Sequence, residues 1–209
     1  MDRRDFIRTG IAGGALGGAS ITRGEELAKT PKQTEGPFYP TVAQKDKDFD
    51  LTKIAGREDV AKGEKIEIKG VVFDTNGQPI EDASVDIWQA NAAGRYSHPH
   101  DKNPAPLDPA FQGWGIVLSG SKGGFKFRTI KPGAYPATKK WDRPPHIHFK
   151  VTKKGYHELT TQMYFPDEPL NEKDGILKRQ KPDKRELLVA KQVSDDPLTF
   201  EFRLVLEKV

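Results

Sequence analysis

The sequence contains no cysteine, which excludes a disulfide framework, a thiolate metal site and a cysteine nucleophile. It also has no stretch that approaches the ~18 consecutive apolar residues of a membrane-spanning helix. A concentrated basic patch is missing too, because the net charge of +4 is spread through mixed-sign stretches such as "DKDFD" and "NEKDG". We therefore expect neither a membrane span nor binding to nucleic acid.

The N-terminal stretch has the features of a targeting signal rather than of a folded element. Arg3 and Arg4 precede Phe6 and Ile7, and the small-residue run "IAGGALGGASI" follows. That run is too short and too weakly apolar to cross a bilayer, and the paired arginines resemble a twin-arginine export signal. We predict an export signal and linker at residues 1–30 and an exported, periplasmic or secreted protein. A disordered basic tail is the alternative.

Residues 31–209 are predicted to form one domain with a mainly β fold. The 35% hydrophobic content and 11 phenylalanines are adequate for a core, and the 16 prolines indicate many loops. Five stretches show apolar residues alternating with polar or small ones: 66–72, 84–89, 125–128, 157–165 and 199–206. Only "NEKDGILKR" and "KRELLVAK" are compatible with helix, and both are short. We predict a β-sandwich or partly closed barrel of about seven strands, with long active-site loops and little helix.

Two irregular stretches, 91–113 and 131–145, interrupt this pattern. Loops of such length within a compact domain are usually functional or disordered, and the aromatic and proline content here favours order. The first carries Tyr96 and the second carries Tyr135. Each tyrosine taken alone is explained as an ordinary packing residue.

The stretch "RPPHIHFKV" places two histidines on one face of a predicted strand. Ile147, Phe149 and Val151 form an apolar face at period two, so His146 and His148 lie on the opposite face. A half-exposed strand with its polar face in water is one explanation. A preformed pair of metal ligands is the other.

Together the two tyrosines and the two histidines make a donor set with its own chemistry. Phenolate oxygen is a hard anionic donor, and two phenolates favour a trivalent metal, whereas neutral imidazoles add no charge. Zinc sites use His, Cys or carboxylate ligands more often. A metal-dependent hydrolase built on His98, His100 and Asp101 is a rival hypothesis, but no general base stands near them in the sequence.

With these four residues in place, the chain resembles the intradiol ring-cleavage dioxygenases, which are non-haem Fe(III) enzymes that open catechols between the two hydroxyl-bearing carbons. The resemblance covers about residues 34–165. It rests on an ordered series of motifs: "TEGPFYP", "GVVFDTNGQPIEDASVDIWQANAAGRYSH", "PLDPAFQGWG", "FRTIKPGAYP", "RPPHIHF" and "TTQMYF".

The resemblance implies roles for individual residues, with a catechol and O2 as substrates and non-haem Fe(III) as cofactor. It makes four residues the iron ligands: Tyr96, Tyr135, His146 and His148. It makes Arg143 the arginine that stabilises anionic charge on the substrate ring, and Gln162 the glutamine paired with it. Tyr135 is also implied to be the ligand that leaves the metal and accepts a proton from the catechol, since no carboxylate is expected nearby.

Within the family, the short stretch of 33 residues before "TEGPFYP" is expected of protocatechuate 3,4-dioxygenase subunits. With all four ligands present, the chain resembles the iron-carrying subunit. This resemblance implies a protocatechuate-like substrate and a homo-oligomer. It does not decide whether a second kind of subunit is also required. Ala137 stands where such enzymes commonly carry an aromatic residue, so catechol or hydroxyquinol 1,2-dioxygenase activity is an alternative. A secreted prealbumin-like β-sandwich binding module without catalysis is a further alternative, because "GVVFDTNGQPIEDASVDIW" also resembles its strands.

Overall fold

The structure is a computed structural model that describes residues 26–42, 44 and 46–209. The predicted export signal therefore lies outside the described residues, apart from the last five positions of the predicted linker. Among the residues described, no helix has the length and apolar character needed to cross a membrane.

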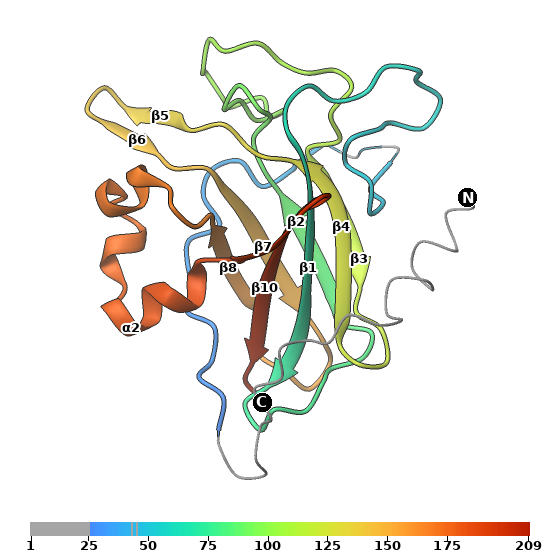
Figure 1. Cartoon of the computed structure of the whole chain (residues 1–209), viewed down its shortest axis with the longest axis vertical. Helices are drawn as coiled ribbons and strands as arrows, with labels where there is room; N and C mark the ends of the chain where they lie inside the picture. The colour runs from blue at the N-terminus through green and yellow to red at the C-terminus, as the bar shows by residue number, and fades with distance from the viewer. Residues whose placement is uncertain (1–25, 43, 45) are drawn as a thin grey trace.

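Two four-stranded sheets pack face to face (Figure 1). One contains, in spatial order, β4 (Gly124–Ile130), β1 (Lys65–Asp74), β10 (Leu198–Leu206) and β9 (Lys191–Asp195). The other contains β3 (Trp114–Leu118), β2 (Ser84–Trp88), β7 (His146–Thr152) and β8 (Leu159–Tyr164). Strands β1 and β10 run parallel, and the other neighbouring pairs are antiparallel. The predicted mainly β sandwich is confirmed, without a closed barrel among the described residues.

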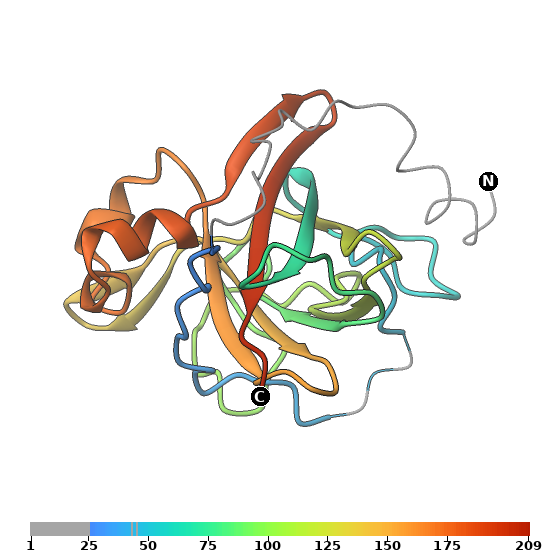
Figure 2. The same ribbon diagram turned by 90° about the horizontal axis from the view of Figure 1, so that it is seen from below.

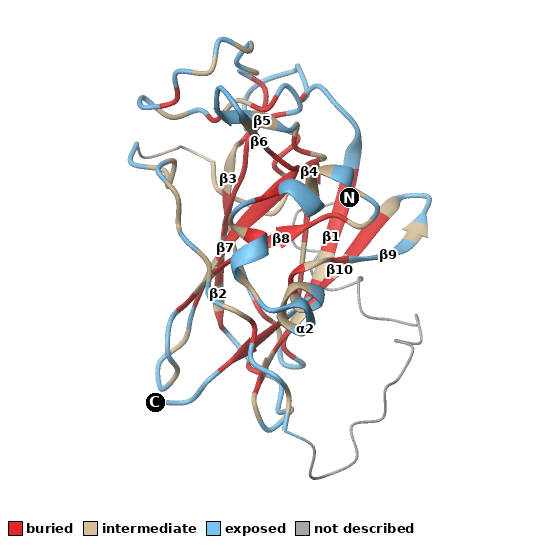
Figure 3. Cartoon of the chain, turned by 90° about the vertical axis from the view of Figure 1, so that its left-hand side faces the viewer, coloured by how far each residue is buried: buried red, intermediate tan, exposed pale blue. Residues whose placement is uncertain are grey.

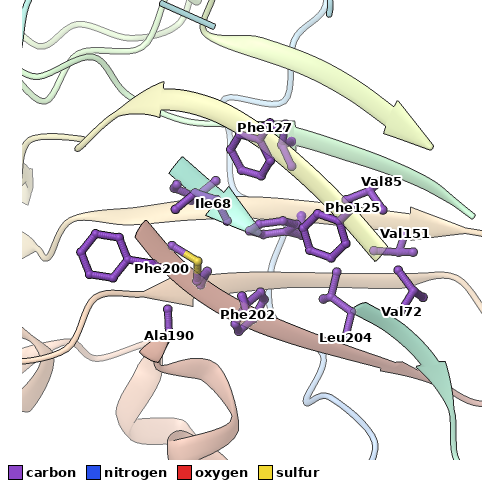
Figure 4. Packing of buried hydrophobic residues seen from close by; sticks show 14 of the residues in the cluster. Ile68, Val72, Val85, Phe125, Phe127, Val151, Ala190, Phe200, Phe202 and Leu204 are labelled. Atoms are coloured by element: carbon purple, nitrogen blue, oxygen red, sulfur yellow. The ribbon is translucent and has the colours of Figure 1, made fainter. Parts of the chain in front are cut away.

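The core lies between the two sheets and follows from the period-two pattern of the strands. Inward-facing side chains of β1, β4 and β10 meet those of β2 and β7 (Figure 4). Phe149 of β7 is at the centre, with its ring 6.0 Å from that of Phe127 and 5.3 Å from that of Phe202. Buried residues are concentrated in the strands of the two sheets, and the loops at the ends are largely exposed apart from buried segments next to the candidate site (Figure 3).

The segment between Leu27 and Leu51 provides hydrogen-bond partners for strand edges that would otherwise be open. Thr30 N–H donates to Val205 of β10, and Gln33 N–H donates to Thr160 of β8. Lys47 and Phe49 accept from residues of β3 and β4. Unpaired strand edges invite association with other chains, so this segment closes the sandwich. It also brings residues 33–38 over the end of β7 and β8, where the candidate site lies.

Two details of the predicted secondary structure differ from the structure. The stretch 131–145 is not wholly irregular, because it contains a hairpin of β5 (Tyr135–Thr138) and β6 (Trp141–Arg143). These strands are too short for a readable alternation, and Pro136 weakens the strand signal further. With β3 and β9 also present, the described residues form ten strands instead of the predicted seven or so.

The two sequence stretches that are compatible with helix, "NEKDGILKR" and "KRELLVAK", form short helical turns. The first gives the 3₁₀ turns η1 (Pro169–Lys173) and η2 (Leu177–Arg179), and the second gives α2 (Pro182–Arg185) followed by η3 (Glu186–Leu188). This helical segment lies beside the β5–β6 hairpin in both views (Figures 1 and 2).

Candidate active site

The four predicted metal ligands come from three segments that meet at one end of the sandwich. His146 and His148 lie on β7, Tyr96 lies in the loop 91–113, and Tyr135 begins β5. The hydroxyl oxygen of Tyr96 is 3.4 Å from His146 Nε2 and 3.1 Å from His148 Nε2. The ring of Tyr135 is 5.7 Å from the ring of Tyr96 and 5.7 Å from that of His146. The structure therefore brings all four side chains together.

The alternation on β7 is as predicted, but its polar face is not exposed to water. Ile147 and Phe149 belong to the core, and His146 and His148 on the other face are only 2% and 3% exposed. The half-exposed strand is therefore the wrong explanation for this face. The ring of His148 stacks on Trp88 of β2, with the centroids 4.7 Å apart and the planes 13° from parallel.

Hydrogen bonding fixes the direction in which His146 offers a lone pair. Its Nδ1 lies 2.6 Å from the carbonyl oxygen of Pro144. A carbonyl can only accept, so Nδ1 carries the proton and Nε2 keeps its lone pair toward Tyr96. This arrangement, with one ring nitrogen held by a backbone carbonyl, is typical of metal-binding histidines.

Burial controls the protonation of all four groups. It lowers the pKa of His148 to about 3, aided by the charge of Arg143, and burial together with the charges of Arg143 and His148 holds the pKa of His146 well below its usual value. Both imidazoles are thus neutral at pH 7. Burial raises the pKa of Tyr96 well above 10, helped by the neighbouring Tyr135, and burial also raises the pKa of Tyr135. The charge of Arg143 does not outweigh this burial, so the phenols stay protonated unless a metal cation binds beside them.

The two tyrosine-bearing loops are held together by close contact between their backbones. Gly133 N–H donates to the carbonyl of Asn91 at 2.9 Å. Gly94 has a φ of +77°, and a Cβ built there would lie 2.2 Å from the carbonyl oxygen of Ala134. A Cβ on Gly133 would lie 2.4 Å from the carbonyl oxygen of Ala92. Only glycine allows this approach, and each glycine stands two residues before a tyrosine of the site.

Asp101 has a structural role in the loop 91–113. Its carboxylate accepts from the backbone N–H of Tyr96 at 2.7 Å and from that of Asn103 at 2.8 Å. His98 and His100 do not converge with it on a metal position, and His100 is exposed. In the part of the chain that the structure describes, no three His, Asp or Glu side chains are grouped so as to hold a metal ion. The hydrolase hypothesis therefore has no support.

Arg143, the last residue of β6, is only 4% exposed and is held by several acceptors. Its Nη2 donates to Gln162 Oε1 at 2.6 Å and to the Tyr164 hydroxyl at 3.1 Å, and its Nε donates to Asp174 Oδ2 at 3.1 Å. The side-chain amide of Gln162 in turn donates to the carbonyl of Thr34 at 2.8 Å, which leaves Oε1 facing Arg143. Arg143 and Gln162 are thus in contact, as the resemblance implied.

Asp174 and Tyr164 also belong to the site and were not predicted from the sequence. Tyr164 lies within "TTQMYF", where its position beside Gln162 was a usable signal. Asp174 lies in "NEKDG", which was considered only as a mixed-sign stretch compatible with a short helix, and its side chain is fully buried. A carboxylate therefore does lie next to the site, contrary to expectation, although it is occupied by Arg143.

A cavity of about 570 Å³ opens beside these residues. Tyr135, Arg143 and His148 contribute to its wall, and the other lining residues are Thr34, Gly36, Pro37, Phe38, Asp101, Lys102, Asn103, Pro104, Pro136, Ala137, Trp141 and Ile176. The volume suits a small aromatic ligand. Lys102 is exposed and can meet an anionic substituent on such a ligand.

Comparison with known proteins agrees with this geometry. The family model described as Dioxygenase matches residues 34–207, which include every residue of the site named above. The chain belongs to the intradiol dioxygenase family. It is 38% identical over 202 residues to the protocatechuate 3,4-dioxygenase beta chain of Burkholderia cepacia, covering 90% of this chain and 86% of that one. It is 29% identical to a catechol 1,2-dioxygenase of Candida albicans, covering 76% of this chain and 54% of that protein.

Solved structures of intradiol dioxygenases show the same fold. The dioxygenase domain of a dioxygenase carbohydrate-binding protein fusion from Streptomyces sp. SirexAA-E superposes with a TM-score of 0.65 at 30% identity, covering 87% of this chain and all of that one. The 3-chlorocatechol 1,2-dioxygenase of Rhodococcus opacus 1CP superposes with a TM-score of 0.68 at 25% identity, covering 86% of this chain and 73% of that one. The relatives of this chain are ring-cleaving enzymes, so it is an intradiol ring-cleavage dioxygenase rather than a binding module without catalysis.

Proposed function

We propose that this intradiol dioxygenase uses non-haem Fe(III) held by Tyr96, Tyr135, His146 and His148, and that it cleaves a catechol of the protocatechuate type. The observation that carries the proposal is the convergence of the Tyr96 hydroxyl on the Nε2 atoms of both histidines, beside Tyr135 and at the wall of the cavity.

The chemistry of these side chains fits Fe(III). Two phenols supply hard anionic oxygen once a cation lowers their pKa, and two imidazoles that are neutral at pH 7 supply nitrogen without adding charge. The lone pair of His146 Nε2 is already directed toward Tyr96 by the bond from Nδ1 to Pro144. Bound there, Fe(III) would supply a Lewis acid for a catechol and its reaction with O2.

The remaining chemistry belongs to the side chains of the chain itself. Arg143 presents a buried positive charge at the cavity wall, where it stabilises negative charge that develops on the substrate ring. Gln162 fixes the guanidinium through its 2.6 Å hydrogen bond. Tyr135 borders the cavity, and its pKa is raised by burial, so its phenolate oxygen is well suited to take a proton from a catechol hydroxyl.

Lys102 and the 38% identity to a protocatechuate 3,4-dioxygenase beta chain support a substrate that carries a carboxylate. Catechol and hydroxyquinol are the alternatives, because Ala137 at the cavity wall is small and exposed and because relatives acting on both are 29% and 31% identical to this chain.

The test combines metal analysis, visible absorption and oxygen uptake on the purified protein. The purified protein should contain iron. It should also be reddish, because Fe(III) bound by tyrosinates gives a visible charge-transfer band. Oxygen uptake should be fastest with protocatechuate when it is compared with catechol, hydroxyquinol and chlorinated catechols at equal concentration. A colourless protein that consumes no oxygen with any of them would refute the proposal, whereas a preference for catechol would refute only the substrate.

Two further proposals concern assembly and location. Relatives of this chain carry the names alpha and beta chain, which supports an oligomer, and light scattering on the purified protein tests it. Export through a twin-arginine route rests on Arg3 and Arg4, which precede Phe6, Ile7 and a run of small residues. Replacing both by lysine should keep the protein in the cytoplasm, and normal export of that variant would contradict the proposal.

A further inference from the structure

Asp174 is a fully buried carboxylate between the turns η1 and η2, and both of its oxygens are occupied. Oδ2 accepts from Arg143 Nε at 3.1 Å, and Oδ1 accepts from the backbone N–H of Ile176 at 2.7 Å. Buried charges persist only when they are paired and hydrogen-bonded, and Asp174 has both kinds of partner. The carboxylate is therefore fixed on the main chain at one oxygen and on Arg143 at the other.

The segment around Asp174 also packs against the hairpin that carries two groups of the site. Tyr135 and Arg143 are paired across β5 and β6. Trp141 of β6 lies next to Gly175, where an added Cβ would be 3.7 Å from its indole ring. The guanidinium carbon of Arg143 is 5.8 Å from the centroid of the Trp141 ring. Asp174 is thus the polar contact of a larger interface between η1–η2 and the hairpin.

The contacts of Arg143 divide its guanidinium into a side held by buried acceptors and a side toward the cavity. Nε and Nη2 donate to Asp174, Gln162 and Tyr164. On its remaining side Arg143 forms part of the cavity wall, where the hydroxyl of Tyr135 is within hydrogen-bond reach of the guanidinium. Because the guanidinium is planar and rigid, fixing Nε and Nη2 also fixes the direction of Nη1.

We propose that Asp174 is a positioning residue for the ring-cleavage reaction, which holds the Arg143 guanidinium so that Nη1 faces the substrate cavity. The inference rests on the proposed function of Arg143. Holding the segment η1–η2 would require only an acceptor for the Ile176 N–H, which a neutral side chain can supply. The second oxygen of Asp174 accepts from Arg143, and Tyr164 is within hydrogen-bond reach of the same carboxylate.

The experiment is a double-mutant cycle between Asp174→Asn and Arg143→Ala, followed by steady-state kinetics on the iron-containing enzyme. Asparagine has the shape of aspartate but one acceptor oxygen, so it cannot serve both Ile176 N–H and Arg143 Nε. We expect Asp174→Asn to lower kcat about tenfold to a hundredfold, as for ~1 Å misplacement of a reacting group, with little change in KM. In the Arg143→Ala background the same change should alter kcat less than about twofold, because the residue it positions is gone.

Asp74→Asn is the matched control. Asp74 is equally buried, accepts from the backbone N–H groups of Asn76 and Gln78 and pairs with Lys208, but it lies at the far end of β1. It should lose stability without losing kcat. Equal losses of kcat from Asp174→Asn in both backgrounds would overturn the inference, and so would equal losses in Asp174→Asn and Asp74→Asn.

A readout independent of activity separates this inference from the proposed function. A crystal structure of Asp174→Asn should show the Arg143 guanidinium displaced while Tyr96, His146 and His148 keep their positions. If the guanidinium stays in place, the inference is wrong even when the wild-type enzyme cleaves catechols. If the wild-type enzyme cleaves none, the proposed function fails, and the crystal structure still decides whether Asp174 orients Arg143. Should Asp174→Asn not fold, Asp174→Ser, which keeps a hydroxyl acceptor for Ile176, replaces it in both tests.

Discussion

Gly94→Ala should inactivate the enzyme through a displacement of the two tyrosine-bearing loops. The added Cβ would lie 2.2 Å from the Ala134 carbonyl oxygen, whereas ordinary contacts begin at 3.4 Å. The loops must therefore separate by more than 1 Å. Tyr96 lies two residues after Gly94, and Tyr135 follows Ala134 directly, so this shift reaches both phenols. A misplacement of ~1 Å at a reacting centre costs roughly a hundredfold in kcat.

The loss of stability has two parts that a control can separate. Alanine at a positive φ costs roughly 1–2 kcal/mol, and overpacking a close contact adds about 1–3 kcal/mol. Gly155→Ala carries the first cost alone, because Gly155 has a φ of +87° and a Cβ added there would have no neighbouring atom within 4 Å. Gly155 is in the turn after β7, at the opposite end of that strand from His146.

The assay measures thermal unfolding, iron content, visible absorption and oxygen uptake of both variants beside the wild type. Both should unfold at lower temperature, by about 2–4 °C for each kcal/mol lost. Only Gly94→Ala should lose turnover and change colour. If Gly94→Ala retains the turnover and colour of Gly155→Ala, the backbone contact does not position the tyrosines and the reasoning is refuted.

Three further substitutions test individual roles in the site. Arg143→Ala should keep iron and colour but lose roughly 10²–10³ in kcat, as for removal of an electrostatic donor, and loss of iron would make Arg143 structural instead. Tyr135→Phe should bind iron with an altered colour and bind catechol slowly in stopped-flow absorption, whereas a wild-type rate there with a slow rate in Tyr96→Phe would reverse the assignment. Lys102→Ala should raise KM roughly twofold to fivefold for protocatechuate, the range of an exposed ion pair, but not for catechol. Lys139→Ala, at the exposed hairpin tip and away from the cavity lining, should change neither KM.

The strands and the common face of His146 and His148 were readable from the sequence because they depend on local pattern. Period-two alternation identified the buried faces of β1, β4, β7 and β10, since one face of each meets the core. The same alternation placed His146 and His148 on one face. Burial of that face could not be read locally, because it depends on Trp88 of β2 and on residues 33–38, which are distant in sequence.

The burial of Asp174 and its pairing with Arg143 could not be predicted from local sequence patterns. In the sequence it is one charge among Glu172, Lys173 and Lys178, and these neighbours are exposed in the structure. Its burial arises only when η1 and η2 pack against the β5–β6 hairpin. That packing brings Asp174 to Arg143, which lies 31 residues earlier in the chain. The hairpin itself was missed because its strands are short. A contact between two elements without a readable pattern leaves no local signal in either one.

The surroundings of the two tyrosines give a physical reason for assigning them different tasks. Tyr96 is only 3% exposed, its backbone N–H is held by Asp101, and its hydroxyl lies within reach of both histidines. Tyr135 is half-buried, begins a two-stranded hairpin with exposed neighbours, and borders the substrate cavity. A side chain that must move to accept a proton needs free volume beside it, and only Tyr135 has the cavity on one side. A side chain that must stay in place needs contacts on every side, as Tyr96 has. The packing of the two loops therefore already has the asymmetry that the proposed roles of the two tyrosines require.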